Sequence, residues 1–189
     1  MTTVDDIVRK ATEVTFNKPL VTNVFRSVLV EAIVAAALSD WDWCSRDYAS
    51  CDFRHPDSTR LEVKQSAARQ TWLAGHASRA SWDIRPRTGY WGKNGWVPRP
   101  GRYAHVYVLA HHPVVNKKAD HRDPHQWLFY VVAACALPKT NSISEAGAAS
   151  LTNPVTFEGL ARRVKALRTS IRKSRLSERS GRSSRNSRS

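Results

Sequence analysis

The sequence predicts an α/β fold in which a central mixed sheet is flanked by helices. Three observations support this prediction: an apolar stretch with helical spacing over residues 24–38, two alternating segments joined by a turn over residues 48–66, and further strand-like segments at 103–110 and 126–137. The length of 189 residues corresponds to one domain of ordinary size. We therefore expect a single folded domain over residues 1–173, followed by a basic tail.

The chain opens with a predicted amphipathic helix that ends before Pro19. Thr3 is placed to cap its first turn, where Asp5 and Asp6 complement the positive end of the helix dipole. Its apolar residues, which recur at helical spacing, are Val4, Ile7, Val8 and Ala11.

A second, longer helix is predicted from Val24 to Leu38, with Asn23 as its N-cap. It is apolar almost all round, so we expect it to be largely buried. Glu31 is its only acidic residue and has no basic residue three or four positions away. A carboxylate in such surroundings is costly unless a cation meets it, although an exposed position for Glu31 is equally compatible with the sequence. The face expected to pack inward consists of Phe25, Val28, Leu29, Ala32, Ile33 and Ala36.

Residues 48–66 predict a β-hairpin whose polar faces carry acidic side chains. Side chains alternate along a strand, so Asp52 lies on the polar face of the first strand, and Glu62 and Lys64 lie on that of the second. A loop of three residues, Pro56 to Ser58, or one of five residues sets Asp52 opposite Glu62, whereas loops of even length put the two carboxylates on opposite faces. In the first case their Cβ atoms are ~5 Å apart.

Later segments complete the sheet. Ser81 to Arg85 is a short strand candidate, and residues 86–102 are expected to form a long loop. We expect Trp91 and Trp96 of this loop to tuck under the sheet. The basic residues of the loop, which we expect to contact DNA, are Arg87, Lys93, Arg99 and Arg102.

The last predicted helix begins near Phe157 and has one basic side. The stretch from Leu160 to Ser189 carries a charge of +10, which leaves +4 of the total of +14 for residues 1–159. From residue 174 to 189 the composition of serine and arginine cannot bury a core and predicts disorder. A basic segment of this kind favours polyanions such as nucleic acid or an anionic membrane surface. The helix residues expected to bind nucleic acid are Arg162, Arg163, Lys165 and Arg168.

Composition also bears on the cellular compartment. No apolar run approaches the ~18 residues of a membrane span, and the acidic N-terminal residues do not resemble a signal peptide. Three cysteines, Cys44, Cys51 and Cys135, form no paired motif, which indicates a reducing compartment. We therefore expect a cytoplasmic protein without a membrane partner, whose oligomeric state is open and includes a homodimer.

Two carboxylates and a lysine on one hairpin suggest a site for a hard cation. Mg²⁺ prefers oxygen ligands and is often held by one or two carboxylates together with water and substrate phosphate; Mn²⁺ is the alternative ion. Such an ion lowers the pKa of bound water and neutralises charge that develops on a phosphate. The competing interpretation is that Glu62 and Lys64 are ordinary solvated side chains, since alternation of this kind is typical of any sheet with one wet face.

The helix acid Glu31, the strand that carries Asp52, the turn and the tripeptide Glu62-Val63-Lys64 resemble the PD-(D/E)XK nuclease superfamily. More narrowly, Glu62-Val63-Lys64-Gln65-Ser66-Ala67 is similar to a group of uncharacterised bacterial proteins of this type. The resemblance covers about residues 20–137 and implies the restriction-endonuclease-like fold, a three-layer core with a central mixed sheet flanked by helices.

The resemblance also implies roles for individual residues. Asp52, Glu62 and the carbonyl of Val63 would bind the metal, with Glu31 as a further ligand. Lys64 would be the catalytic lysine, and the neighbouring Gln65 would belong to the same site.

The expected function is metal-dependent hydrolysis of phosphodiester bonds in nucleic acid, with DNA as the expected substrate. The first alternative is a non-catalytic nucleic-acid-binding protein that keeps the nuclease-like fold. The second is an interaction protein whose Arg/Ser tail binds RNA or acidic partners.

Overall fold

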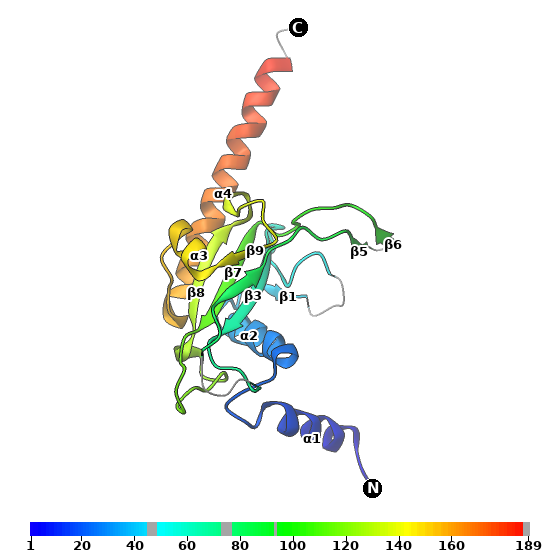
Figure 1. Ribbon diagram of the computed structural model, residues 1–189. Coiled ribbons are helices and arrows are strands. Elements are labelled where there is room, and N and C mark those ends of the chain that lie inside the picture. Colours follow the sequence, from blue (N-terminus) through cyan, green and yellow to red (C-terminus); the bar gives the residue numbers. More distant parts are fainter. Residues whose placement is uncertain (45–48, 73–76, 93, 187–189) are drawn as a thin grey trace.

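A computed structural model describes residues 1–44, 49–72, 77–92 and 94–186 of the chain. The fold is mixed α/β, with a five-stranded mixed sheet and four helices (Figure 1). Two short 3₁₀ turns, 124–126 and 134–136, flank the last strand of the large sheet. The helices are α1 (Val4–Phe16), α2 (Asn23–Ala37), α3 (Glu145–Leu151) and α4 (Phe157–Asn186). The strands are β1 (Asp42–Trp43), β2 (Phe53–Arg54), β3 (Arg60–Ala67), β4 (Ser81–Asp83), β5 (Tyr90–Gly92), β6 (Gly95–Val97), β7 (Val106–His112), β8 (Leu128–Ala133) and β9 (Ser142–Ser144).

The large sheet has the strand order β1-β2-β3-β7-β8. Its centre is the parallel pair of β3 and β7, in register from Leu61 opposite Val106 to Ala67 opposite His112, while the other neighbouring strands are antiparallel. All seven residues of β7 are buried. A central strand buried on both sides requires cover on both faces of the sheet, and the chain supplies it.

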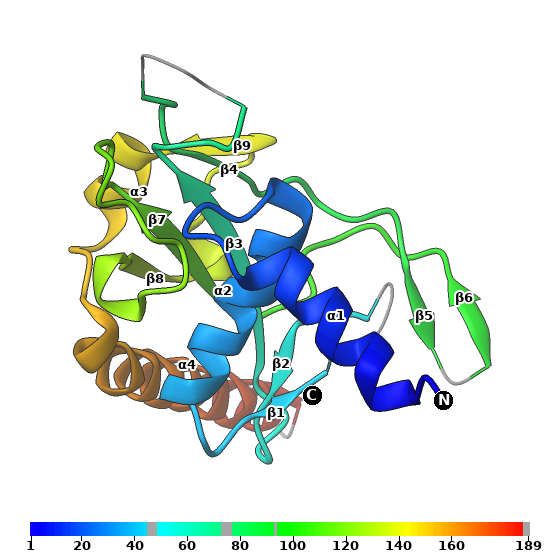
Figure 2. The same ribbon diagram turned by 90° about the horizontal axis from the view of Figure 1, so that it is seen from below.

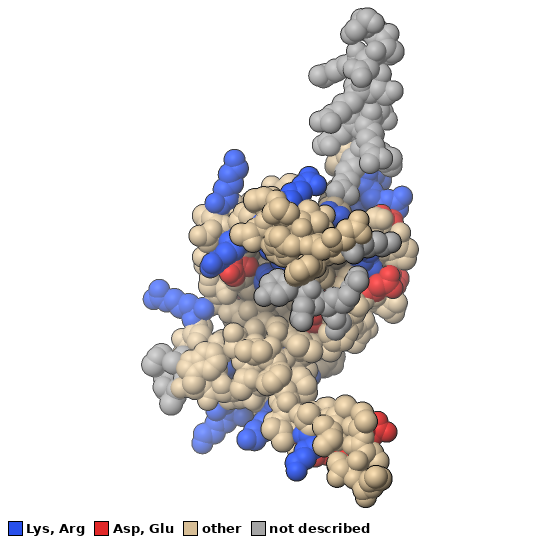
Figure 3. Space-filling model, turned by 90° about the vertical axis from the view of Figure 1, so that its right-hand side faces the viewer, with Lys and Arg blue, Asp and Glu red and all other residues tan. Residues whose placement is uncertain are grey.

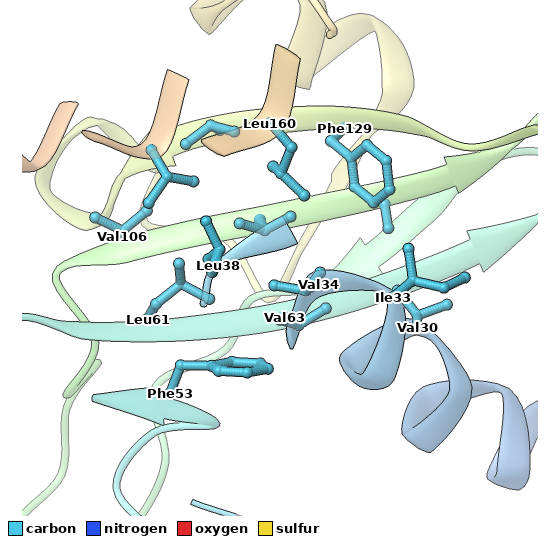
Figure 4. Close-up of a cluster of buried hydrophobic side chains, with 14 of the residues drawn as sticks. Val30, Ile33, Val34, Leu38, Phe53, Leu61, Val63, Val106, Phe129 and Leu160 are labelled. Atoms are coloured by element: carbon cyan, nitrogen blue, oxygen red, sulfur yellow. The ribbon is translucent and has the colours of Figure 1, made fainter. Parts of the chain in front are cut away.

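Two helices cover one face of the sheet and a small ribbon covers the other (Figures 1 and 2). On the first face, α2 and α4 pack against β3, β7 and β8 through one apolar cluster, whose centre is drawn in Figure 4. On the second face, the two-stranded sheet of β4 and β9 packs with α3 over a second cluster. Residues of the first cluster that are fully buried include Val30, Val34, Phe53, Leu61, Val106, Phe129 and Leu160.

Helix α2 forms where predicted but buries a different side. Phe25 and Val28, which were expected to face inward, are 47% and 46% exposed. The buried residues of the helix are Arg26, Val30, Ile33 and Val34. Because the helix is apolar almost all round, its periodicity does not specify which side meets the sheet. Its N-cap is Thr22 rather than the predicted Asn23, and the cap makes no side-chain hydrogen bond.

Helix α1 is the predicted amphipathic helix. Thr3 caps it through a reciprocal capping box with Asp6. The helix has no buried residue, and its apolar residues Val4, Ile7 and Val8 remain exposed. It lies beyond the end of α2, outside the layers of the sheet (Figure 1).

The last helix extends beyond residue 173, where the sequence predicts the start of a disordered tail. Helix α4 continues without a break to Asn186, and residues 187–189 lie outside the described part of the chain. No proline follows Pro154, and Gly181 is the only glycine after Gly159, so the sequence contains no strong signal that would end the helix earlier. Among the described helices, none combines the length and the apolar character that crossing a membrane requires.

Candidate active site

The hairpin that carries the predicted acids has one of the registers that the sequence permits. Phe53 pairs with Leu61 and Arg54 with Arg60. The loop between the strands has three residues, closed by a hydrogen bond of 2.9 Å from the His55 N–H to the Thr59 carbonyl. Ser58 adopts a positive φ of 67°, as the last residue of a three-residue hairpin loop commonly does. The predicted start of the first strand, Tyr48, lies outside the described residues.

The strand bulges at Asp52, which changes where its carboxylate points. The Asp52 N–H donates to the carbonyl of Leu61 at 3.0 Å, although Leu61 is already paired with Phe53. Two residues of one strand thus face one residue of the other, which is the definition of a β-bulge and re-aims the side chain. The expected direct opposition of Asp52 and Glu62 is therefore absent from the described pairing. Instead, Asp52 Oδ2 accepts a hydrogen bond of 2.7 Å from the Val63 N–H, at the edge of β3 that β2 no longer covers.

Glu62 is a buried carboxylate that two cations neutralise. Glu62 is 2% exposed, and its Oε1 accepts hydrogen bonds from Lys64 Nζ at 2.7 Å and from Arg87 Nη2 at 2.5 Å. A second Arg87 nitrogen, Nη1, donates to the carbonyl of Ala49 at 2.6 Å. A buried charge is tolerated when it is both paired and hydrogen-bonded, and Glu62 meets both conditions. The sequence analysis assigned Arg87 to a DNA-contacting loop and missed this pairing, because 25 residues separate Arg87 from Glu62.

Glu31 reaches the same region from α2. Its Oε2 accepts a hydrogen bond of 2.8 Å from the indole Nε1 of Trp43 on β1. The direct partner of Glu31 is therefore an indole N–H, whereas the sequence analysis considered a cation or an exposed position. The positive charge of Lys64 still acts on the carboxyl group through space.

Four of the five predicted catalytic side chains line one hollow of about 240 Å³. The hollow lies at the open edge of β3, with α2 on one side and the end of β4 on the other. Asp83 of β4 belongs to it and was not predicted, because only the packing of β4 beside β3 brings this exposed acid near. Glu62 does not line the hollow, whereas Lys64, with which it forms an ion pair, does. The lining residues are Asn23, Ser27, Glu31, Asp52, Val63, Lys64, Gln65 and Asp83.

The crowding of carboxylates changes their acidity. Burial, and next the negative charge of Glu62, raise the pKa of Asp52 to about 7, with a smaller contribution from Glu31. The hydrogen bond from Val63 and the charge of Lys64 act in the opposite direction. Burial also raises the pKa of Glu31, against the effect of its hydrogen bond from Trp43. The site therefore holds more negative charge than its local hydrogen bonds compensate.

Gln65 is held in place by a residue that the sequence analysis did not single out. Its Oε1 accepts a hydrogen bond of 2.7 Å from Nε of Arg26, and its amide nitrogen donates to Asn23 Oδ1 at 3.0 Å. Arg26 is 1% exposed, and burial lowers the pKa of its guanidinium to about 10. Arg26 could have been noticed as a lone cation on a helix predicted to be buried.

The donor chemistry of this site suits a divalent cation. Asp52, Glu62, Glu31 and the carbonyl of Val63 offer the hard oxygens that Mg²⁺ and Mn²⁺ prefer. The positions, however, do not form a ready-made ligand shell: among the described residues, no group of three or more His, Cys, Asp or Glu side chains lies close enough to hold a metal ion. Burial, and next the charge of Glu62, raise the pKa of Asp52, and a nearby cation would favour its ionised form.

The basic residues of α4 lie elsewhere. Arg162, Lys165 and Arg168 line a separate hollow of about 190 Å³ beside the end of α2, and it shares no lining residue with the carboxylate site. Arg168 is engaged there: its guanidinium contacts His55 and forms an ion pair with Asp57 Oδ2 at 3.3 Å. Arg163, the fourth predicted residue, is partly buried.

Comparisons of the chain with protein-family models, with curated proteins and with solved structures found no match.

Proposed function

We propose that this protein is a metal-dependent nuclease whose active site lies at the open edge of β3. The observation that carries the proposal is the convergence of Asp52, Glu31 and Lys64 on one hollow, with a pKa of about 7 for Asp52. Two acids whose pKa values are raised by burial and mutual charge, next to an amine, are typical of sites that bind cations or move protons. The resemblance of this hairpin to PD-(D/E)XK nucleases, and hence the restriction-endonuclease-like fold, belongs to the same proposal.

The chain's own residues have distinct parts in this proposal. Asp52, Glu62, Glu31 and the Val63 carbonyl would hold Mg²⁺ or Mn²⁺, which when bound would activate water and neutralise charge on the phosphate. The amine of Lys64 donates a hydrogen bond of 2.7 Å to Glu62, which holds it in position. In this position it would hold the attacking water and stabilise the negative charge of the phosphate.

Supporting residues complete the proposed site. Gln65, held by hydrogen bonds with Arg26 and Asn23, would form part of the rim of the hollow. Arg87 would keep Glu62 ionised.

Nucleic acid, and DNA in particular, is the proposed substrate. The net charge of +14 favours a polyanion, and the exposed Arg162 and Lys165 of α4 can add contacts to phosphate that do not depend on base sequence.

A second candidate function is binding of nucleic acid without cleavage. One observation favours it: Glu62 already has two cationic partners, Lys64 and Arg87, and needs no metal for its neutralisation.

Cleavage by the Lys64→Ala variant separates the two functions. Purified wild type and variant are incubated with plasmid and with single-stranded DNA, with Mg²⁺, with Mn²⁺ or with EDTA. A nuclease that uses Lys64 loses about 100-fold or more of its rate in the variant, and all activity in EDTA. The exposed Lys139, on the loop before β9, gives the matched control variant Lys139→Ala, which should cleave as the wild type does. Equal cleavage by wild type and Lys64→Ala contradicts the proposal.

A further inference from the structure

The segment from residue 87 to residue 101 forms an arm that projects from the body (Figures 1 and 2). β5 and β6 pair within it, and Arg87 and Gly101 close its base through two backbone hydrogen bonds of 3.0 and 2.9 Å. Gly95 turns the chain at the tip with a φ of 114°, a conformation that glycine adopts without strain. Residues 86–102, which were predicted to form a long loop, thus contain two short paired strands.

The tryptophans of the arm do not tuck under the sheet, contrary to our expectation from the sequence. Trp91 is 57% exposed and Trp96 is 41% exposed. They are directly paired across the two strands, with ring centroids 5.9 Å apart and an angle of 67° between the ring planes. Directly paired residues lie on the same face of a ribbon, so the two rings form one exposed aromatic surface, in which they meet edge to face.

The arm's own backbone fixes the position of this surface. A Cβ added at Gly89 would lie 2.5 Å from the ring of Trp96 and 2.4 Å from the carbonyl of Val97. The ring of Trp96 therefore rests on the backbone at Gly89. Exposed aromatic side chains have few rotatable bonds, so they lose little conformational entropy when they bind a flat ligand.

The charge around the aromatic pair is positive. From residue 84 to residue 119 the sequence contains no acidic residue, and the arm and its base contain Arg85, Arg87, Lys93, Arg99 and Arg102. Figure 3 views the molecule from the side on which the arm projects and shows Lys and Arg side chains around the edge of that face. Exposed rings within a basic segment are the combination that binds single-stranded nucleic acid, because unpaired bases stack on the rings while cations meet the phosphates.

The arm is joined to the candidate site by Arg87. This residue closes the base of the arm through its backbone and binds Glu62 and the Ala49 carbonyl through its side chain. Trp91 lies four residues farther along the chain, on β5.

We propose that the arm binds unpaired nucleotides by stacking bases on Trp91 and Trp96, so that the substrate of the candidate site is a single strand or a duplex end or junction with unpaired bases. As a statement about the substrate, this inference rests on the proposed nuclease function. As a statement about binding, it is tested independently of cleavage.

The test measures the affinity of the full-length protein for a fluorescein-labelled oligothymidylate of about 12 nucleotides and for a duplex of equal length, by anisotropy in EDTA. We expect the single strand to bind more tightly, and Trp91→Ala and Trp96→Ala each to weaken its binding by about 5- to 140-fold. Trp91→Phe and Trp96→Phe should keep most of the affinity, because a phenyl ring still stacks. The control variant Trp72→Ala removes a tryptophan that is 64% exposed outside the arm and should bind as the wild type does.

Three results would overturn the inference: alanine variants that bind within about twofold of the wild type, a preference for the duplex, or equal losses for Trp72→Ala. Sedimentation of the same variants detects a rival role, since a change of oligomeric state with unchanged oligonucleotide binding would make the arm a protein interface. The proposed nuclease function is read separately from Lys64→Ala. Binding that depends on the tryptophans, without cleavage in Mg²⁺, would support base stacking on the arm and contradict the proposed nuclease function. Cleavage without such binding would support the nuclease function and contradict base stacking on the arm.

Discussion

Replacing Asp52 with asparagine should make the protein more stable. The side chain lies where burial and the charge of Glu62 raise its pKa to about 7 in the folded protein, against about 3.9 in an unfolded chain. The folded state therefore holds the proton more tightly, so ionisation of Asp52 opposes folding. This penalty is small below about pH 4, grows as pH rises to about 7 and is constant above that, where three pKa units correspond to about 4 kcal/mol.

The expected gain is smaller than this limit. Asparagine can still accept the hydrogen bond from Val63 N–H but forfeits the charge assistance, which costs about 1 kcal/mol. We therefore expect Asp52→Asn to raise the free energy of unfolding by about 3 kcal/mol near pH 8.5, and by about 1 kcal/mol or less near pH 5.

Urea unfolding followed by tryptophan fluorescence, in EDTA at both pH values, measures this difference. Asp83→Asn is the matched control: Asp83 lines the same hollow but is exposed, and its hydrogen bonds to Arg85 outweigh burial and lower the pKa of its carboxyl. The control should not be stabilised at either pH. An Asp52→Asn variant no more stable than the wild type near pH 8.5, or a gain that is the same near pH 5, would refute the reasoning.

Three further predictions concern metal binding, the core and the C-terminal helix. Mg²⁺ at about 100 times its dissociation constant should raise the unfolding free energy of the wild type by about 2.7 kcal/mol and leave that of Asp52→Ala unchanged in a thermal-shift assay; an equal shift for both proteins would place the ion elsewhere. Phe129→Ala, at a fully buried position between α4 and the sheet, should lower the unfolding free energy by about 3–5 kcal/mol in urea titrations, and a loss below about 1 kcal/mol would contradict the packing described. Deleting residues 174–189, which contain five arginines, should weaken DNA binding and flatten its salt dependence, since each lost phosphate contact removes about 0.9 from the slope of log K against log salt; an unchanged slope would show that this segment makes no phosphate contacts.

The hairpin was predictable because its determinants are local. Alternation of side chains from Arg60 to Ser66 and a turn sequence around Pro56 limit the register to a few choices, and the observed pairs belong to one of them. The bulge at Asp52 was not predictable, because alternation of residue types does not reveal an inserted residue whose signal lies in backbone hydrogen bonds. Asp52 lines the hollow, but its hydrogen bond from the Val63 N–H was not predicted.

Features that depend on packing between residues far apart in the sequence could not be predicted from it. Arg87 contacts Glu62 and Asp83 lines the hollow only in the folded chain, and no local sequence pattern marks either residue. The inward face of α2 is another example, since a helix with apolar residues on every side packs as its neighbours dictate. Trp91 was expected to be buried because most large apolar residues are, but it is exposed.

The double role of Arg87 makes the arm and the carboxylate site thermodynamically dependent on each other. Arg87 closes the base of the arm through its backbone and neutralises Glu62 through its guanidinium, so a movement of the residue alters the energy of both contacts. If a ligand on the arm draws Arg87 away from Glu62, the affinity of Glu62 for any other cation rises by a certain factor. Reciprocity then requires that a cation on Glu62 strengthen the binding of that ligand by the same factor.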